Sequence, residues 1–229
     1  MANCNMQPDH TIILGAKTLK KARRNLRYGF DFRSEQPDLS SADIFIPRLD
    51  IKLEDVCVAL DWNVSCLNTA NVNDNQVKNL LVKLVPSMVV YSGFGGQIVS
   101  KDVLGLGYPF LHIHSGWLPK YRGSTTIYYS LLQDGACAAS AFFLDEGIDT
   151  GSLVRRKKYP MPDFETEIDH LYDGAIRADL LIEVLSSLKN KKKVESQKKI
   201  CDANIPASHF YVIHPVLKHL AKLRCKKSE

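Results

Sequence analysis

The sequence has 229 residues, of which 45% are hydrophobic and 24% charged, with a formal net charge of +5 at pH 7. This length and composition are typical of one globular domain and exclude an intrinsically disordered chain. The apolar runs are too short for a membrane span, and the six cysteines show no Cys-x-x-Cys spacing or cluster of metal ligands. Because the first residues also lack the features of a signal peptide, we predict a cytoplasmic protein with free thiols, no membrane contact and no metal site.

The first part of the chain alternates short apolar runs with segments of helical spacing. Residues 10–16, 42–47 and 64–67 are predicted to form strands, and residues 17–27 and 53–60 to form helices. This alternation predicts a mostly parallel sheet with flanking helices. No Gly-x-Gly-x-x-Gly pattern follows the first strand, which disfavours a dinucleotide site of the NAD type.

A glycine-rich loop follows the next predicted helix and strand. The helix is expected to begin after Asn73 or Asp74 and to end before Pro86, and residues 87–92 form the strand. The strand runs into Gly93-Phe-Gly-Gly-Gln-Ile-Val99. Three glycines in four positions let a backbone approach a ligand closely, although a simple turn explains them equally well.

The central stretch of the sequence combines a buried strand with a polar loop at residues 115–126, which we call the elbow. Residues 110–114 are predicted to form the strand, three breakers (Gly116, Pro119 and Gly123) follow, and a Ser or Thr in residues 124–126 is placed to cap a new helix. His112 and His114, two positions apart, point to the same face of the strand. One histidine at a strand end is more often a satisfied polar residue than a catalytic one. A pair needs two sets of partners and favours a ligand site.

A second glycine-punctuated loop, Asp145 to Gly151, follows a predicted strand at residues 138–144. If the two strand ends lie together as in a βαβ unit, Asp149 can reach His114. Residues 152–160 are predicted to form an outer strand with exposed cations. Residues 166–188 form the longest predicted helix, with an apolar face in the core and His170 on the polar side.

The last part of the chain is predicted to be an extension of the main domain. We divide the chain into a catalytic domain, residues 1–200, and an extension of residues 201–229, formed by a docked turn and helix and a basic tail. The basic runs at 189–193 and 224–227 are more typical of solvated segments than of a site for an anionic partner. No nucleic-acid-binding module is recognisable.

Two motifs carry a resemblance to a known family. The first motif runs from His112 to Gly123 and reads His-x-His-x-x-x-Leu-Pro-x-Tyr-Arg-Gly. The second runs from Asp145 to Gly151 and reads Asp-Glu-Gly-x-Asp-Thr-Gly. Together they resemble the signature of the 10-formyltetrahydrofolate-dependent formyltransferases. That family includes glycinamide ribonucleotide transformylase, the catalytic domain of methionyl-tRNA formyltransferase and the sugar N-formyltransferases. The resemblance runs from about Pro86 to about Pro162. It implies a Rossmann-like α/β fold, with an open, mostly parallel twisted sheet, and N10-formyltetrahydrofolate as the formyl donor.

The resemblance also implies roles for individual residues. His114 would donate a hydrogen bond to the formyl oxygen, and Asp149 would orient it or relay a proton. The backbone of the glycine-rich loop would hold the pterin ring. The residues predicted to bind the folate are Gly95, Gly96, Gln97, Ile98, Val99, Asp145 and Gly147. The residues predicted to meet the acceptor are Trp117, Lys120, Tyr121, Arg122, Ser124 and Thr125. Arg122 suits a phosphate, although it can equally hold loop carbonyls.

One residue departs from the family pattern. The family signature has asparagine where this chain has His112. In relatives the asparagine helps to polarise the formyl oxygen, so His112 must do so with a ring N–H or not at all. We expect His114→Ala to abolish turnover and His112→Asn to retain or raise it.

The acceptor is the least determined part of the interpretation. We predict a small acceptor, a nucleotide-linked amino sugar, because few residues follow residue 190 for the tRNA-binding domain of methionyl-tRNA formyltransferases. Glycinamide ribonucleotide formyltransferase, a formyltetrahydrofolate hydrolase and a non-catalytic folate- or nucleotide-binding relative stay open. A homo-oligomer is also compatible with the sequence.

Overall fold

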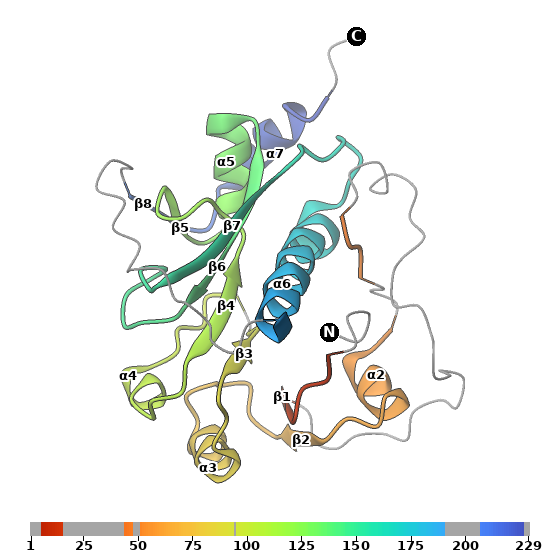
Figure 1. Cartoon of the computed structure of the whole chain (residues 1–229). Helices are drawn as coiled ribbons and strands as arrows, with labels where there is room; N and C mark the ends of the chain where they lie inside the picture. Colours follow the sequence, from red (N-terminus) through yellow and green to blue (C-terminus); the bar gives the residue numbers. More distant parts are fainter. Residues whose placement is uncertain (1–5, 16–43, 48–50, 94, 191–206, 227–229) are drawn as a thin grey trace.

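The computed structural model describes residues 6–15, 44–47, 51–93, 95–190 and 207–226, which alternate between strands and helices (Figure 1). The elements are β1 (Thr11–Leu14), α2 (Leu53–Ala59), β2 (Val64–Leu67), α3 (Asn75–Leu84), β3 (Val89–Tyr91), α4 (Lys101–Leu104), β4 (Phe110–His114), β5 (Tyr121–Gly123), α5 (Thr126–Asp134), β6 (Cys137–Phe143), β7 (Leu153–Tyr159), a π-helical turn (Ile168–Tyr172), α6 (Asp173–Asn190), β8 (Ser208–Phe210) and α7 (Pro215–Leu223). The helix predicted at 17–27 lies outside the described residues. Of the strand predicted at 42–47, residues 44–47 are described, and they hold a single bridge rather than a strand.

The central sheet has four strands in the order β3-β4-β6-β7, and two parallel pairs, β1–β2 and β5–β8, lie beside it. Strand β3 runs parallel to β4, whereas β6 runs antiparallel to both of its neighbours. The predicted α/β fold with parallel strands and flanking helices is confirmed, and its central sheet is mixed. Strand β7 is antiparallel because the segment 144–152 is too short for the crossover that a parallel connection needs.

The largest cluster of buried apolar residues lies on the face of β4 opposite to the two histidines. Leu111 and Ile113 project from that face and pack in one cluster with Tyr172 and Ile176. Helix α6, which carries Ile176, lies along the sheet in Figure 1. Because successive side chains of a strand alternate between faces, His112 and His114 project on the other side of the sheet.

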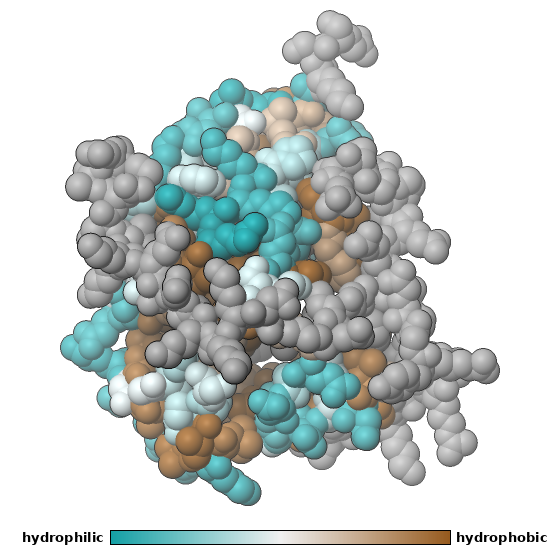
Figure 2. Space-filling model, in the orientation of Figure 1, coloured by the Kyte–Doolittle hydropathy of each residue, from teal (hydrophilic) through white to brown (hydrophobic). Residues whose placement is uncertain are grey.

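Helix α3 shows how the local sequence sets element boundaries. The side chain of Asp74 accepts a hydrogen bond from the Gln76 N–H at 2.8 Å, as predicted for the cap of this helix. The helix ends at Leu84, and the residue that follows, Val85, has φ 47°. Val82 and Val85 are exposed, and the hydrophobic surface at the lower end of Figure 2 lies over this helix. Among the described residues, no helix combines the length and the apolar character needed to cross a membrane.

The end of the chain packs against the elbow that follows β4. Strand β8 pairs with β5, with Gly123 opposite Phe210, and α7 lies next to α5. The His214 side chain caps α7 by accepting a hydrogen bond from the Val216 N–H. The division proposed between residues 200 and 201 falls outside the described residues.

Candidate active site

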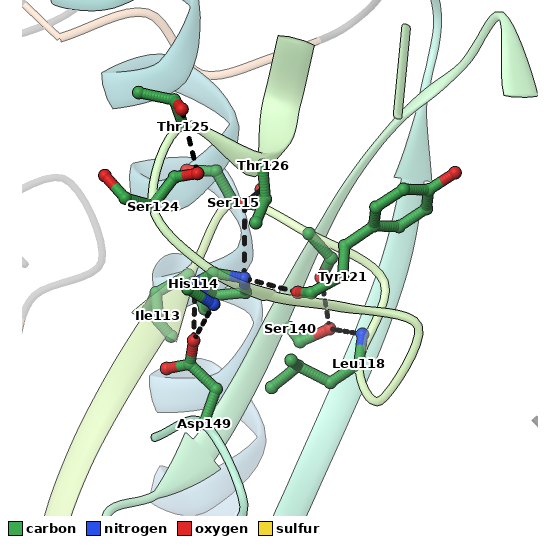
Figure 3. Close-up of polar contacts among 12 residues, drawn as sticks. Ile113, His114, Ser115, Leu118, Tyr121, Ser124, Thr125, Thr126, Ser140 and Asp149 are labelled. Atoms are coloured by element: carbon green, nitrogen blue, oxygen red, sulfur yellow. Dashed lines mark hydrogen bonds and ion pairs between the residues drawn. The ribbon is translucent and has the colours of Figure 1, made fainter. Parts of the chain in front are cut away.

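His114 is buried at the end of β4, with 8% of its surface exposed. Its Nε2 lies 2.8 Å from the carbonyl oxygen of Tyr121 (Figure 3). A carbonyl oxygen can only accept a hydrogen bond, so Nε2 carries the hydrogen. The other ring nitrogen, Nδ1, is therefore the one that can gain or lose a proton at the site.

Gly116 makes the hydrogen bond between His114 and Tyr121 possible. A Cβ atom at this position would lie 2.7 Å from His114 Nε2 and 2.9 Å from the Tyr121 carbonyl oxygen. Any side chain at residue 116 would therefore separate the two partners.

Asp149 lies on the Nδ1 side of the His114 ring. Its Oδ2 is 3.7 Å from Nδ1 and accepts a hydrogen bond from the Gly123 N–H at 2.7 Å. The carboxylate is 13% exposed. The elbow thus fixes both members of the pair, because Tyr121 holds the imidazole and Gly123 holds the carboxylate. The distance of 3.7 Å exceeds a direct hydrogen bond and leaves Nδ1 available to a reacting group.

The proximity of Asp149 to His114 is confirmed, but the predicted route to it is wrong. Strand β6 runs antiparallel to β4 and ends beside Leu111, near the beginning of β4. The chain then turns back, so that Asp149 lies next to the other end of the strand (Figure 3). Gly151 permits this turn, since a Cβ there would lie 1.7 Å from the Phe143 carbonyl oxygen.

His112 is held differently from His114. Its Nδ1 lies 3.0 Å from the carbonyl oxygen of Tyr91 on β3, so in this ring Nδ1 carries the hydrogen. The ring lies between the side chains of Tyr91 and Phe142, at centroid distances of 5.8 Å from each. Burial lowers the pKa of His112 below its usual value, against an opposing contribution from the hydrogen bond to Tyr91.

Two buried hydroxyl residues, Thr126 and Ser140, also lie at the site, and the sequence analysis missed Ser140. Thr126 Oγ1 donates to the Ser115 carbonyl oxygen at 2.5 Å and lies 3.3 Å from His114 Nε2. Ser140 Oγ donates to the Gly116 carbonyl oxygen at 2.6 Å and accepts from the Leu118 N–H at 3.1 Å. Ser140 is fully buried, and as a polar residue in the otherwise apolar run 138–144 it gave a signal that could have found it.

The glycine-rich loop lies at the same end of the sheet as the two histidines, because it follows β3 and β3 is parallel to β4. Gly95 and Gly96 are exposed, and a Cβ at either would meet no atom within 4 Å. The Ile98 side chain is 59% exposed beside them. Open backbone next to an exposed apolar side chain fits a flat heterocycle with donors and acceptors, as the pterin prediction requires.

Two side chains of this loop face away from such a ligand. Gln97 donates to the Ala70 carbonyl oxygen at 3.0 Å and accepts from the Val72 N–H at 3.2 Å. Val99 is buried in the core. These residues can therefore contact a ligand with their backbone only.

Asp145 and Gly147 stabilise the Asp149 loop itself. Asp145 Oδ1 accepts hydrogen bonds from the Gly147 N–H at 3.0 Å and the Thr150 hydroxyl at 2.5 Å. A Cβ at Gly147 would lie 2.1 Å from Thr150 Oγ1. Their predicted contact with folate stays a prediction, in addition to this observed structural role.

The residues predicted to meet the acceptor fall into two groups. Trp117 is partly exposed, and the Arg156 guanidinium lies 4.5 Å from its ring centroid. Lys120 pairs with Asp134 at 2.6 Å, and this contact raises the pKa of its amine. The buried Nε of Arg122 has no hydrogen-bond partner in the part of the chain that the structure describes. Trp117, Lys120 and Arg122 form the accessible group.

The second group is committed to the fold. The Tyr121 side chain is completely buried and stacks on Phe210 at 5.5 Å, so the prediction that it meets the acceptor is wrong, and its carbonyl serves the site instead. The Thr125 hydroxyl donates to the Ser124 carbonyl oxygen and accepts from the Ile213 N–H at 2.9 Å. It therefore does not cap α5 as predicted, because it holds the C-terminal segment.

Comparisons with known proteins agree on one family. Residues 39–179 match the family model described as formyl transferase. The chain is 32% identical over 145 residues to a methionyl-tRNA formyltransferase of Finegoldia magna, over 62% of this chain and 46% of that protein. The chain thus spans about half the length of the curated relatives that it matches.

Solved structures show the same fold. A sugar N-formyltransferase from a Shewanella species superposes with a TM-score of 0.53 at 17% identity, covering 76% of this chain and 71% of that one. A formyltransferase from Anoxybacillus kamchatkensis, solved with UDP-4,6-dideoxy-4-formamido-L-AltNAc and tetrahydrofolate, superposes with a TM-score of 0.53 at 14% identity. It covers 89% of this chain and 86% of its own.

Proposed function

Because the chain belongs to the formyl transferase family, we propose that it transfers a formyl group from N10-formyltetrahydrofolate to the amine of a small acceptor, a nucleotide-linked amino sugar. The observation that carries this proposal is the pair of His114 Nδ1 and Asp149 Oδ2, 3.7 Å apart, which the elbow holds on both sides. The location of the Asp149 loop beside the histidines also agrees with the two motifs of the family signature.

His114 supplies the hydrogen-bond donor in this proposal. Its Nε2–H is already bound to the Tyr121 carbonyl, so only Nδ1 can act on the substrate. When Nδ1 also carries a proton, it can donate to the formyl oxygen as negative charge develops there, and Asp149 balances the charge of the ring. A fixed donor to such an oxyanion is worth about 3–4 kcal/mol of transition-state stabilisation.

The glycine-rich loop and the elbow bind the two substrates. The open backbone at Gly95 and Gly96, with Ile98, suits the pterin of the formyl donor, which supplies the formyl group. Trp117 is partly exposed with Arg156 and Lys158 over its ring, and Arg122 adds a further cationic group, a combination that suits a sugar nucleotide.

Folate binding is tested with 5-formyltetrahydrofolate, a stable relative of the donor. A ligand at a hundred times its Kd stabilises the folded state by about 2.7 kcal/mol. For a chain of this size we expect Tm to rise by about 5–10 °C. No shift at saturating concentrations would contradict folate binding.

The acceptor is tested by mass spectrometry after incubation with N10-formyltetrahydrofolate and a panel of amines. The panel holds UDP-linked 4-amino sugars, glycinamide ribonucleotide, charged initiator methionyl-tRNA and a reaction without acceptor that reports formate release. We expect the formyl group on a sugar amine. Formate release without any amine would instead establish a hydrolase.

Methionyl-tRNA is the second candidate acceptor. It is favoured by one observation, namely that the relatives identified by sequence include methionyl-tRNA formyltransferases at 25–32% identity. Formylation of the charged tRNA, with no product from any sugar, would establish it in place of the first candidate.

A further inference from the structure

The two histidines of β4 present opposite chemistry to the site. The hydrogen of neutral His112 lies on Nδ1 and is donated to the Tyr91 carbonyl oxygen at 3.0 Å. A neutral imidazole has one N–H, so its Nε2 carries a lone pair and is an acceptor. In the described part of the chain, Nε2 has no hydrogen-bond partner. The family signature has an asparagine here, whose amide group can donate, and this ring cannot replace that donor while it is neutral.

We propose that His112 Nε2 is the proton acceptor of the transfer reaction, so that position 112 acts as a base in this chain. The inference rests on the proposed function and deepens it. His112 and His114 project from the same face of β4, two residues apart, and form a base and a donor for one substrate.

The proton balance of the step is complete. The lone pair of the acceptor amine forms a bond to the formyl carbon, and one amine proton moves to His112 Nε2. The bond between the formyl carbon and the donor nitrogen then breaks, and the proton passes from Nε2 to that nitrogen. His112 returns to its neutral form, and its Nδ1–H stays bound to Tyr91 throughout.

The surroundings of His112 keep the ring neutral before the reaction. Burial between β3 and β6 disfavours the imidazolium form. Three charged groups act on the ring through space. Arg177 of α6, which bonds the Ile113 carbonyl oxygen, and His114 of β4 oppose a further positive charge, and Asp149 favours one. The lowered pKa of His112 is the sum of these influences, so Nε2 is unprotonated at neutral pH.

A spectroscopic test needs no substrate. In protein labelled with ¹⁵N-histidine, long-range ¹H–¹⁵N correlation spectra report which ring nitrogen carries the hydrogen, and His112→Asn assigns the signal. At pH 7 we expect Nδ1 of His112 to be protonated and Nε2 to be unprotonated, whereas His114 shows a protonated Nε2. A protonated Nε2 in His112 would overturn the inference.

The kinetic test compares two amide variants with the wild type. In His112→Asn the amide occupies the position of Nδ1, which keeps the contact with Tyr91 and removes Nε2. In His112→Gln the amide reaches the position of Nε2 but has no basic lone pair. We expect both to lose about a hundredfold or more in kcat/KM with N10-formyltetrahydrofolate and the UDP-linked 4-amino sugars above. This expectation replaces the one drawn from the family signature, that His112→Asn retains activity.

The pH profile separates a base from a structural role. Wild-type kcat/KM should fall as the pH drops through the lowered pKa of His112, and this limb should be absent in both variants. An active wild type whose His112→Asn variant keeps the same rate and the same acid limb overturns the inference alone. A wild type that transfers no formyl group to any acceptor overturns the proposed function, whatever the spectra show.

Discussion

His112 and His114 are two residues apart on one strand and carry their hydrogen on opposite ring nitrogens. The carbonyl group that each ring contacts determines which nitrogen carries the hydrogen. His112 bonds to the carbonyl of Tyr91 on the neighbouring strand, and His114 bonds to the carbonyl of Tyr121 on the elbow. A residue that was expected to contact the acceptor, Tyr121, thus acts through its backbone. At this scale the site is determined by main-chain acceptors as much as by side chains.

Asp149→Asn is expected to reduce kcat/KM by a factor of about 10² to 10⁴, because it removes the negative charge beside His114 Nδ1. The fold should persist, since the amide oxygen can still accept from the Gly123 N–H and asparagine tolerates the φ of 52° at this position. Steady-state kinetics and thermal unfolding are measured together.

The matched control is Glu146→Gln in the same loop. Glu146 is exposed and pairs with Lys101 at 2.7 Å, whereas Asp149 lies beside His114. A loss of activity of similar size in both variants would show that the effect comes from the net charge of the loop and not from Asp149.

His112 should make stability depend on pH. Its folded-state pKa is lowered, so between that pKa and the unfolded value of about 6.5 the unfolded chain binds more protons than the folded one. The free energy of unfolding therefore decreases as the pH falls below about 6.5. Urea unfolding of wild type and His112→Asn at several pH values between about 5.5 and 7.5 should show a smaller decrease in the variant. His170→Asn, at an exposed position, controls for the loss of one histidine.

At the scale of elements, the elbow and the Asp149 loop depend on close backbone approaches. Gly116, Gly123 and Gly151 each lie where a Cβ would contact backbone or His114 atoms. These three glycines are therefore required by geometry, since each permits a contact that positions His114 or Asp149.

Gly123→Ala should destabilise the protein by roughly 2–4 kcal/mol. The residue has φ 101°, and a Cβ would lie 2.1 Å from the Phe210 carbonyl oxygen across the β5–β8 pair. Gly174→Ala is the matched control, because its Cβ would meet no atom within 4 Å and alanine favours the helix by about 0.5–1 kcal/mol. Chemical unfolding measures the stability of both variants. Equal stability would contradict the close approach of β5 and β8 at Gly123.

At the scale of the whole molecule, the end of the chain supports the site. Phe210 stacks on Tyr121, whose carbonyl holds His114, and makes a tilted ring contact with Tyr129 of α5 at 4.4 Å. Thr125 accepts from the Ile213 N–H. The C-terminal segment is therefore connected to the active-site elbow through side chains and backbone.

Phe210→Ala is expected to destabilise the protein by about 1–3 kcal/mol, or about 2–4 °C in Tm for each kcal/mol. It should also lower activity, because the elbow loses its support. Tyr211→Ala changes the next residue, which is 84% exposed, and should alter stability by less than about 0.5 kcal/mol. If the Phe210→Ala variant retains full stability, then β8 and α7 contribute little to the folded core.

The sequence by itself determined the elements whose signals are local. The apolar run from Phe110 to His114, the cap at Asp74 and the helical spacing after residue 166 each reflect hydrophobic period or capping chemistry, and the structure shows all three. The paired motifs also identified the family, because fixed spacings of histidine, aspartate and glycine are rare by chance.

Other features depend on contacts between residues far apart in the sequence, and only the tertiary structure determined them. Strand β6 runs antiparallel to β4, with Phe142 opposite His112. The tautomer of His112 depends on Tyr91, and the burial of the Tyr121 side chain depends on Phe210. The two residues of each pair are between 20 and 90 positions apart in the sequence. Periodicity and local composition carry no information on such partners, because a strand or a ring has the same sequence pattern whichever neighbour it meets.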